Sequence, residues 1–424
     1  MKFDIKNYKI GIIGLGYVGL PMAISFGKKT STIGFDINEV RVESLKNNHD
    51  ITGEIDETEI QKAKFLKITS ERDSLELCNC FIVTVPTPID KNKKPDLSPL
   101  ISACHLISNY IKNNDLVIFE STVYPGCTEE VCIPILEKKS GLILNKDFYV
   151  GYSPERIVPG NNDKTFENII KVTSGSNHES SIIIDNIYKT VVKAGTYLAP
   201  SIKVAEASKA IENSQRDLNI SFFNELAILC SKLNIITKDV IDAASTKWNF
   251  IRLKPGLVGG HCIGVDPYYL IHKAKEIGFN PNVINSGRKT NESIAKHIKD
   301  QCLSYLLKKF IDKKISEISF LLIGFTFKPD CSDIRNTGVY DLYSEISNLG
   351  FKIDIFDPRA NFQEVKETYN IKIVNKLKKY TCIIYCVNHS EFSEIDFNSL
   401  KDNKNSLVYD VTGTLQKNEY TFQL

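Results

Sequence analysis

A single cysteine stands in a glycine-rich stretch, LVGGHCIGVDPYY, at residues 257–269. Gly259 and Gly260 give the backbone before Cys262 conformational freedom and allow a ligand to approach it closely. Structural cysteines more often sit in apolar runs, so Cys262 is a candidate nucleophile. His261 precedes it, but adjacent side chains rarely point at each other and no nearby third residue would orient the imidazole. The sequence therefore argues against a Cys–His hydrolase.

A thiol has a defined use beside a nicotinamide cofactor. A dehydrogenase that stops at an aldehyde needs no nucleophile. One that continues to an acid must first form an adduct at the aldehyde carbon, because hydride leaves only from a tetrahedral carbon. A thiolate forms a thiohemiacetal, the second hydride transfer leaves a thioester, and water releases the carboxylate. Cys262 predicts this chemistry only in a chain that also binds NAD.

The first 36 residues carry a dinucleotide-binding pattern. An apolar run at residues 10–13 has the length and β-branching of a buried parallel strand. Gly14, Gly16 and Gly19 follow it in GxGxxG spacing. The first glycine permits the tight turn, the second lets a pyrophosphate approach, and the third lets the next helix pack on the sheet. The N-terminus of that helix offers free N–H groups to phosphates.

An acid ends the second predicted strand, STIGFD, at Asp36. The interval of about 20 residues from the glycines is the usual one for a carboxylate that binds the ribose hydroxyls. Such a carboxylate repels a 2′-phosphate, so NAD is favoured over NADP. Arg41 nearby opposes this preference, because an arginine can accommodate the 2′-phosphate.

Three further strands end in polar residues: CFIVTVPTP (80–88), LVIFESTVYPG (116–126) and FYVGYSPER (148–156). In an open parallel sheet, ligands bind outside the carboxyl ends of the strands. We therefore expect Thr87, Glu120, Ser121, Thr122 and Glu155 to lie along one edge, at the nicotinamide end of the cleft.

A long amphipathic helix is predicted at residues 201–233, without an internal Gly or Pro. Its apolar residues recur at intervals of three and four: Val204, Ala207, Ile211, Leu218, Phe222, Leu226, Leu229 and Leu233. At about 50 Å it is longer than one small domain needs, so it is expected to bridge domains or form a dimer interface. Lys209 and Asn213, four residues apart, project from one face.

The tail after about residue 315 repeats the strand pattern of the N-terminal part, in ISFLLIGFTFK, KIDIFDP, TCIIYCVNH and SLVYDVTG. It lacks the glycine spacing, which argues against a second NAD bound in the same way. The tail predicts a second α/β nucleotide-type fold, either with other ligand contacts or as scaffold.

Composition excludes several other classes of protein. The chain has 424 residues, enough for about two to three domains, and a net charge of +2. Its basic clusters are short, which argues against a nucleic-acid partner. The first residues do not resemble a signal peptide, and no apolar run reaches the roughly 20 residues of a membrane span, so the expected location is cytoplasmic. The 11 cysteines are an odd number without a CxxC pair, and no metal is expected.

Ordered motifs extend over nearly the whole chain: GxGYVGLP, VPTP, STVYPG, SPER, the Lys–Asn helix, GGHCIGVDP and GFTFKPDCSDIRNT. Together they resemble the UDP-sugar 6-dehydrogenases of the UDP-glucose/UDP-mannosamine type. The resemblance implies NAD-linked four-electron oxidation of a sugar C6 alcohol to a uronic acid. It implies an α/β architecture in three parts: a Rossmann NAD domain (1–200), a long central helix with a helical dimerisation segment (201–312) and a Rossmann-like UDP-binding domain (313–424). A homodimer through the central helix is expected.

The resemblance also implies roles for individual residues. Cys262 matches the thiol nucleophile, Lys209 and Asn213 the oxyanion-stabilising pair, Asp266 and Thr122 the residues that position water, and Glu155 an acid–base group in thioester hydrolysis. The implied cofactor positions are Gly14, Gly16, Tyr17, Val18, Gly19, Asp36, Arg41, Thr87, Ser121, Thr122 and Arg335. The implied substrate positions are Glu155, Arg156, Lys209, Asn213, Lys254, Gly259, His261 and Lys328.

Two departures from the UDP-glucose enzymes narrow the expected substrate. Those enzymes usually have a second acid where this chain has Pro159, and a lysine where it has Val265. The motifs are more similar to the branch that oxidises UDP-N-acetylglucosamine or UDP-N-acetylgalactosamine for Vi-type and O-antigen polysaccharides. UDP-N-acetylmannosamine or UDP-glucose remains an alternative. A two-electron β-hydroxyacid-type dehydrogenase and a non-catalytic nucleotide-sugar sensor are the other hypotheses.

Overall fold

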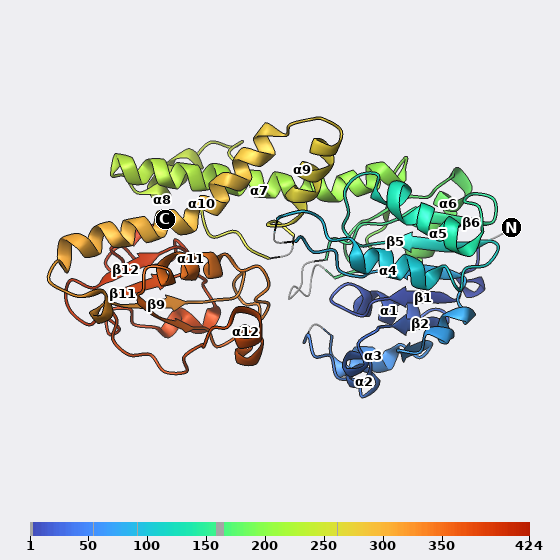
Figure 1. Cartoon of the computed structure of the whole chain (residues 1–424), viewed down its shortest axis with the longest axis horizontal. Coiled ribbons are helices and arrows are strands. Elements are labelled where there is room, and N and C mark those ends of the chain that lie inside the picture. Colours follow the sequence, from blue (N-terminus) through green and yellow to red (C-terminus); the bar gives the residue numbers. More distant parts are fainter. Residues whose placement is uncertain (1–2, 54, 91, 158–164, 261) are drawn as a thin grey trace. The chain divides into compact units, whose positions relative to one another are not determined.

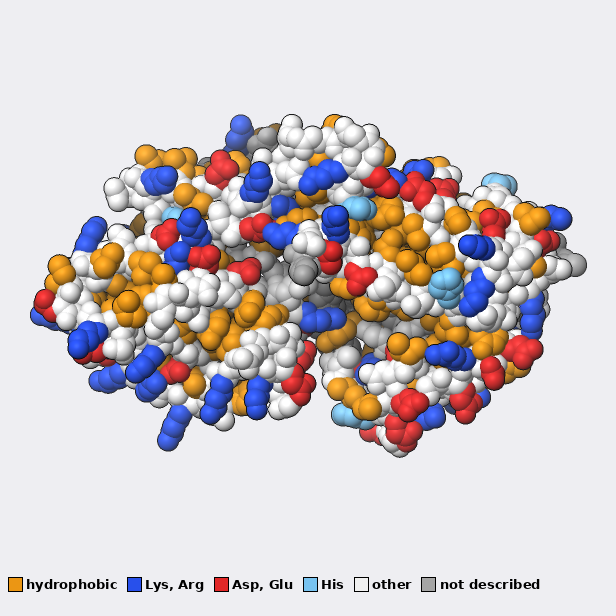
Figure 2. All heavy atoms as spheres, viewed as in Figure 1, with side chains coloured by type: hydrophobic (Ala, Val, Ile, Leu, Met, Phe, Trp, Pro, Cys, Tyr) orange, Lys and Arg blue, Asp and Glu red, His pale blue; other side chains and the backbone are white. Residues whose placement is uncertain are grey.

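The computed structural model describes residues 3–53, 55–90, 92–157, 165–260 and 262–424 (Figure 1). Pro159 and His261 lie outside these ranges. The chain divides into two compact units, Met1–Glu212 with Tyr268–Phe279 and Asn213–Pro267 with Asn280–Leu424. In the described part of the chain, no helix has the length and apolar character needed to cross a membrane. Figure 2 shows Lys and Arg side chains spread among acidic and apolar ones on the surfaces of both units.

The N-terminal unit is built on a six-stranded sheet with the order β3-β2-β1-β4-β5-β6. Its strands are β1 (Ile10–Ile13), β2 (Thr32–Phe35), β3 (Leu66–Thr69), β4 (Cys80–Val83), β5 (Asp115–Phe119) and β6 (Phe148–Tyr152). All neighbouring strands are parallel. This is the strand order of a dinucleotide-binding Rossmann fold, with its topological switch point between β1 and β4. The expected fold of this part is confirmed.

Helices and short segments complete this unit. The helices are α1 (Gly19–Gly27), α2 (Glu39–Lys46), α3 (Glu57–Lys62), α4 (Ser98–Ile107), α5 (Ile133–Ser140) and α6 (His178–Lys189). A two-stranded parallel sheet joins β7 (Lys171–Thr173) and β8 (Thr196–Leu198). The central strands β1, β4 and β5 are buried along their whole length, as expected for strands covered on both faces. Their polar carboxyl ends are therefore where a ligand can reach the sheet.

Four helices form the middle of the chain: α7 (Ile202–Leu233), α8 (Thr237–Ala244), α9 (Asp266–Glu276) and α10 (Asn282–Lys309). The predicted helix 201–233 is confirmed, but five of the eight residues of its apolar stripe are exposed in the described part of the chain. Val204, Ile211, Phe222, Leu229 and Leu233 are between 45% and 62% exposed. The face that is buried carries polar side chains, including Glu206, Lys209, Asn213, Asp217 and Asn224.

The C-terminal unit contains a five-stranded sheet of order β10-β9-β11-β12-β13. Its strands are β9 (Ser319–Ile323), β10 (Lys352–Phe356), β11 (Cys382–Tyr385), β12 (Leu407–Asp410) and β13 (Phe422–Gln423), and all pairs are parallel. Helices α11 (Gly338–Ser347) and α12 (Phe362–Tyr369) follow β9 and β10. The strand order reverses between β9 and β11, which is where an open sheet of this kind binds its ligand. The predicted second nucleotide-type fold is confirmed.

Candidate active site

The glycine turn after β1 is shaped for a dinucleotide. Gly14 has φ +99, and a Cβ on Gly19 would lie 1.8 Å from the carbonyl oxygen of Gly14, so packing within the chain requires both glycines. A Cβ on Gly16 would have no neighbour within 4 Å. The chain itself therefore has no steric need for glycine there, whereas a pyrophosphate approaching the backbone would. Tyr17 and Val18 continue the turn into α1. This cradle fits NAD.

Arg41, whose influence on the choice between NAD and NADP opposes that of Asp36, is paired with a third residue, Asp50. Asp36 ends β2, and its carboxylate accepts the N–H groups of Leu15 at 2.7 Å and Asn38 at 2.8 Å. Arg41 donates Nε to the carbonyl of Leu15 at 3.0 Å and Nη1 to Asp50 at 2.5 Å. Arg41 is 8% exposed, and Asp50 holds one end of its guanidinium. Nε and Nη1 of the arginine are thus engaged by the protein, in agreement with a preference for NAD, while Nη2 has no hydrogen-bond partner among the described residues.

Hydrogen bonds keep Asp50 charged. Burial alone would raise its pKa, but hydrogen bonds from Arg41 and Thr52 hold the pKa below its ordinary value. Asp36 and Arg41 both bind the backbone of Leu15, and Arg41 also binds Asp50. Sequence reasoning missed Asp50, because its pairing with Arg41 depends on how the chain after α2 folds back.

The carboxyl ends of β4 and β5 lie together, as expected. The hydroxyl of Thr87 donates to the carbonyl of Thr122 at 2.6 Å. Ser121 donates to the carbonyl of Val85 at 2.6 Å. Tyr269 on α9 donates its hydroxyl to the carbonyl of Thr87 at 2.7 Å and so fastens this edge. The three predicted cofactor residues of these loops therefore form one polar rim.

Glu155 and Arg156 follow β6 at the same edge of the sheet. Oε1 of Glu155 accepts the N–H groups of Arg156 at 2.6 Å and Ile157 at 2.8 Å. The guanidinium of Arg156 forms an ion pair with Glu212 at 3.3 Å. Glu155 is 8% exposed, which identifies it as a buried carboxylate with a fixed orientation rather than a solvated surface acid.

Helix α7 presents the predicted Lys–Asn pair from its buried face. Lys209 is 7% exposed and Asn213 5% exposed. One turn before Lys209, Glu206 accepts the N–H groups of Gly126 and Thr128, which anchors the loop after β5 to the helix. Asn213 donates its amide to Asp266 at 2.5 Å. The burial of a lysine and an asparagine on a helix is unusual, and it favours a site over a solvated face.

The loop that carries Cys262 is held by specific contacts. Cys262 is exposed, whereas the other ten cysteines are buried. Asn224 on α7 pairs with both backbone groups of Gly256, at 2.8 and 3.1 Å. A Cβ on Gly259 would lie 2.8 Å from the carbonyl oxygen of Asn336, and one on Gly260 would lie 2.8 Å from the ring of Phe327. The glycines therefore allow this loop to pack against the C-terminal sheet while the thiol stays accessible.

A cleft of about 360 Å³ opens at the carboxyl ends of β9, β11 and β12, near the lower end of the size range of ligand sites. Its lining combines the glycine loop, the strand ends and the start of α11. Two predicted substrate residues, Lys254 and Lys328, line this cleft. Because both are cationic and a helix N-terminus lies beside them, the cleft suits a nucleotide with phosphates.

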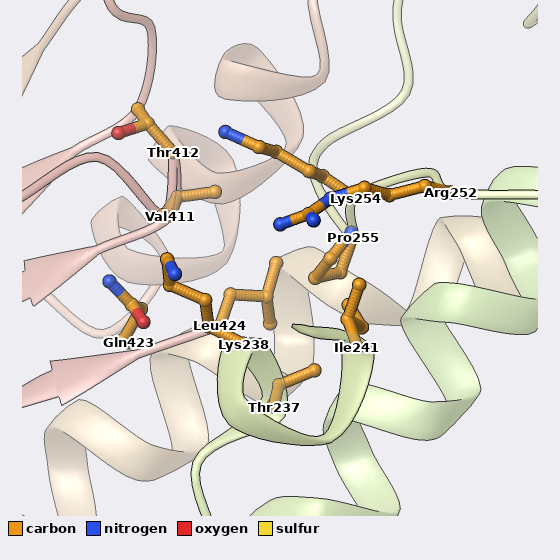
Figure 3. A pocket seen from close by; sticks show the side chains of 11 residues that line it. Thr237, Lys238, Ile241, Arg252, Lys254, Pro255, Val411, Thr412, Gln423 and Leu424 are labelled. Atoms are coloured by element: carbon orange, nitrogen blue, oxygen red, sulfur yellow. The ribbon is translucent and has the colours of Figure 1, made fainter. Parts of the chain in front are cut away.

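A second pocket adjoins this cleft and shares Lys254, Pro255, Val411 and Thr412 with it. Figure 3 shows Arg252 and Lys254 extending from one loop, opposite the residues that follow β12 and above the side chains of α8. Arg335, predicted to contact the cofactor, forms a bidentate pair with Asp333 at 3.0 and 2.7 Å. Its contact with NAD stays a prediction.

Comparisons with known proteins agree with this geometry. Three models of the UDP-glucose/GDP-mannose dehydrogenase family match in order: the NAD binding domain at residues 8–192, the central domain at 203–293 and the UDP binding domain at 321–417.

Named relatives cover almost the whole chain. It is 50% identical to a UDP-N-acetyl-D-glucosamine 6-dehydrogenase of Salmonella typhi over 93% of this chain and 92% of that one. It is 46% identical to a protein of the same name from Pseudomonas aeruginosa over 99% and 100%. A solved UDP-D-ManNAc dehydrogenase of Pyrococcus horikoshii superposes with a TM-score of 0.87 at 28% identity, over 98% of both chains. The chain belongs to the UDP-glucose/GDP-mannose dehydrogenase family.

Proposed function

We propose that this protein oxidises the C6 alcohol of a UDP-N-acetylhexosamine, foremost UDP-N-acetylglucosamine, to the uronic acid. The observation that carries the proposal is the accessible thiol of Cys262 on a glycine loop packed against the nucleotide-type cleft. Two of the relatives that are 46–50% identical carry the name UDP-N-acetyl-D-glucosamine 6-dehydrogenase, which supports this sugar over UDP-N-acetylmannosamine.

The residues divide the work as follows. Gly14, Gly16 and Asp36 would hold NAD at the glycine turn, where the cofactor would accept a hydride, with one NAD used in each of the two oxidation steps. Lys254 and Lys328 bind the diphosphate of the nucleotide. Lys209 and Asn213 stabilise negative charge on the C6 oxygen, where preorganised donors are most effective.

Cys262 adds to the aldehyde carbon, and the oxidised adduct is a thioester. Water then attacks the thioester carbon, the C–S bond breaks, and Cys262 leaves as the thiolate. Glu155 accepts the proton of the attacking water, while Asp266 and Thr122 orient that water. In total the sugar and one water yield the carboxylate, and two hydrides are removed.

The decisive experiment measures NADH formed per sugar for UDP-N-acetylglucosamine, UDP-N-acetylgalactosamine, UDP-N-acetylmannosamine and UDP-glucose. We expect two NADH per UDP-N-acetylglucosamine, with uronate as the product. One NADH per sugar would indicate a two-electron dehydrogenase, and binding without NADH would indicate a sensor. A higher kcat/KM for UDP-glucose would contradict the substrate assignment.

We also propose that the protein is a homodimer through α7, acting in the cytoplasm where NAD and UDP-sugars meet. The exposed stripe of Ile211, Phe222 and Leu229 supports this, because such a row of large apolar side chains marks an association surface. Phe222→Glu is expected to shift the sedimentation coefficient towards that of a monomer, with Glu225→Gln on the same helix as a control. A wild-type monomer at micromolar concentration would contradict the proposal, and fractionation of cells tests the location.

A further inference from the structure

Lys171 is a buried cation at the start of β7, and it is 3% exposed. Its ammonium donates to Oε2 of Glu155 at 2.7 Å, to Oε2 of Glu120 at 2.5 Å and to the carbonyl of Pro154 at 3.1 Å. An ammonium group has three N–H donors, so this set of acceptors is complete. Lys171 therefore has no N–H donor left for a ligand. Its function is to hold the groups that it contacts, which are Glu155, Glu120 and the carbonyl of Pro154.

The second carboxylate fixes the lysine. Glu120 follows β5, is 2% exposed, and accepts the hydroxyl of Tyr188 at its other oxygen, Oε1. The rings of Phe166 and Tyr188 face the ammonium at 5.4 and 5.5 Å from their centroids. Anions and aromatic faces thus enclose the charge of Lys171, and its flexible side chain has a single favourable position.

Glu155 is held from both sides as a consequence. Oε1 accepts two backbone N–H groups, and Oε2 accepts the ammonium of Lys171. Two carboxylates share one ammonium, so the cluster retains negative charge when all three groups are ionised. This matters at Glu155, because a carboxylate that is oriented but incompletely neutralised can still attract a proton from water.

We propose that Lys171 is a positioning residue for Glu155, and that Glu120 with Tyr188 fixes Lys171 in turn. The inference rests on the proposed acid–base role of Glu155 in thioester hydrolysis. In that step water adds to the thioester carbon, its proton passes to Glu155, and the C–S bond to Cys262 breaks. Loss of Lys171 leaves the carboxylate of Glu155 present, but its Oε2 then lacks the hydrogen bond that fixes its orientation.

The test separates oxidation from hydrolysis by pre-steady-state kinetics with UDP-N-acetylglucosamine and saturating NAD. For Lys171→Met we expect a burst of two NADH per active site at the wild-type rate, followed by turnover about 10–100-fold slower. A general packing defect would instead lower the amplitude of the burst. Tyr188→Phe should slow the same step by a smaller factor. Lys189→Met, which removes an exposed lysine paired with Asp185, is the control and should behave as wild type.

A second variant keeps the proposal testable if Lys171→Met does not fold. Above pH 7, where Glu120 is ionised, Glu120→Gln combined with Lys171→Met removes one charge of each sign, so the cluster keeps the net charge of the wild type, and we expect the kinetics of the single lysine variant. The proposal is overturned if a Lys171 variant that folds has wild-type turnover. If neither Lys171 variant folds, wild-type turnover in Tyr188→Phe overturns it. Normal turnover of Glu155→Gln overturns it together with the acid–base role. If Glu155→Gln turns over normally and forms two NADH per sugar, the proposed four-electron oxidation is supported, and only the roles of Glu155 and Lys171 are refuted.

Discussion

Asn213 on α7 donates its side-chain amide to the carboxylate of Asp266, the first residue of α9, at 2.5 Å. The backbone N–H of Asp266 donates in turn to the carbonyl of Cys262 at 2.9 Å. Two consecutive hydrogen bonds therefore connect the predicted oxyanion residue with the loop of the nucleophile. A carboxylate only accepts hydrogen bonds, so Asp266 determines which end of the Asn213 amide faces it.

Asp266→Asn is expected to lower kcat by roughly 10–100-fold. The new amide can both donate and accept, so the orientation of Asn213 is no longer unique. Steady-state kinetics and calorimetric titration with the UDP-sugar measure the effect, and the dissociation constant should change little. An equal loss in binding would show that Asp266 supports the nucleotide cleft instead. Asn282→Ala, at the exposed first residue of α10, serves as the control.

Cys262 is expected to be the first thiol that reacts with a small alkylating reagent. It is exposed and the other ten cysteines are buried, and exposed thiols react faster. Brief treatment with iodoacetamide, followed by peptide mass spectrometry, should find one adduct. Preincubation with NAD and the UDP-sugar should protect it.

The Cys262→Ser variant should bind NAD normally but release no uronate, because a serine does not form the thioester. Cys127→Ser tests a buried thiol and should leave uronate formation intact. Uronate formation at the wild-type rate by Cys262→Ser would contradict the covalent route.

Release of Arg41 should weaken the discrimination against NADP. In Asp50→Asn the guanidinium loses its charged partner and can turn towards a 2′-phosphate, so we expect the NAD/NADP ratio of kcat/KM to fall about tenfold or more. Direct binding of NADP, followed by fluorescence, provides a readout independent of activity. Asp56→Asn is the matched control, because Asp56 caps α3 without a side-chain hydrogen bond. An unchanged ratio with normal folding would exclude Asp50 as a specificity residue.

Stability is expected to depend on pH through Glu120. Burial, opposed by the attraction of Lys171, raises its pKa to about 7. Because the folded state binds this proton more tightly than the unfolded state, the stabilisation is full at pH values below the ordinary pKa and is lost as pH rises through 7. Urea titrations measure the free energy of unfolding at pH 5 and pH 8. Between these pH values we expect it to fall by about 2 kcal/mol more in the wild type than in Glu120→Gln. Equal losses would contradict a shifted pKa.

Much of the architecture was predictable because local patterns encode it. The glycine spacing after β1, the polar residue at each strand end and the periodicity of residues 201–233 identified both nucleotide-type folds and the long helix. The division of the chain at residues 200 and 312 stays a prediction. The short edge strand β13, with only Phe422 and Gln423, was missed because two residues carry no periodicity.

The candidate site was predictable in its residue types but not in its contacts. The sequence placed Lys209 and Asn213 on one face of the helix, and the structure buries them while it exposes Val204, Ile211, Phe222, Leu229 and Leu233 of the same helix. Helical periodicity distinguishes two faces but does not say which one the chain covers, because an apolar face can be reserved for another molecule.

By itself the sequence determined the chemistry available: a thiol on a glycine loop, a dinucleotide turn and cationic residues after buried strands. Only the tertiary structure decided how charges are paired. Lys171 meets Glu120 across 51 positions of the chain and Glu155 across 16, and Asp50 reaches Arg41 by a return of the chain after α2. Such pairs are set by strand order and burial, since a buried charge is stable only beside a partner that no local pattern specifies.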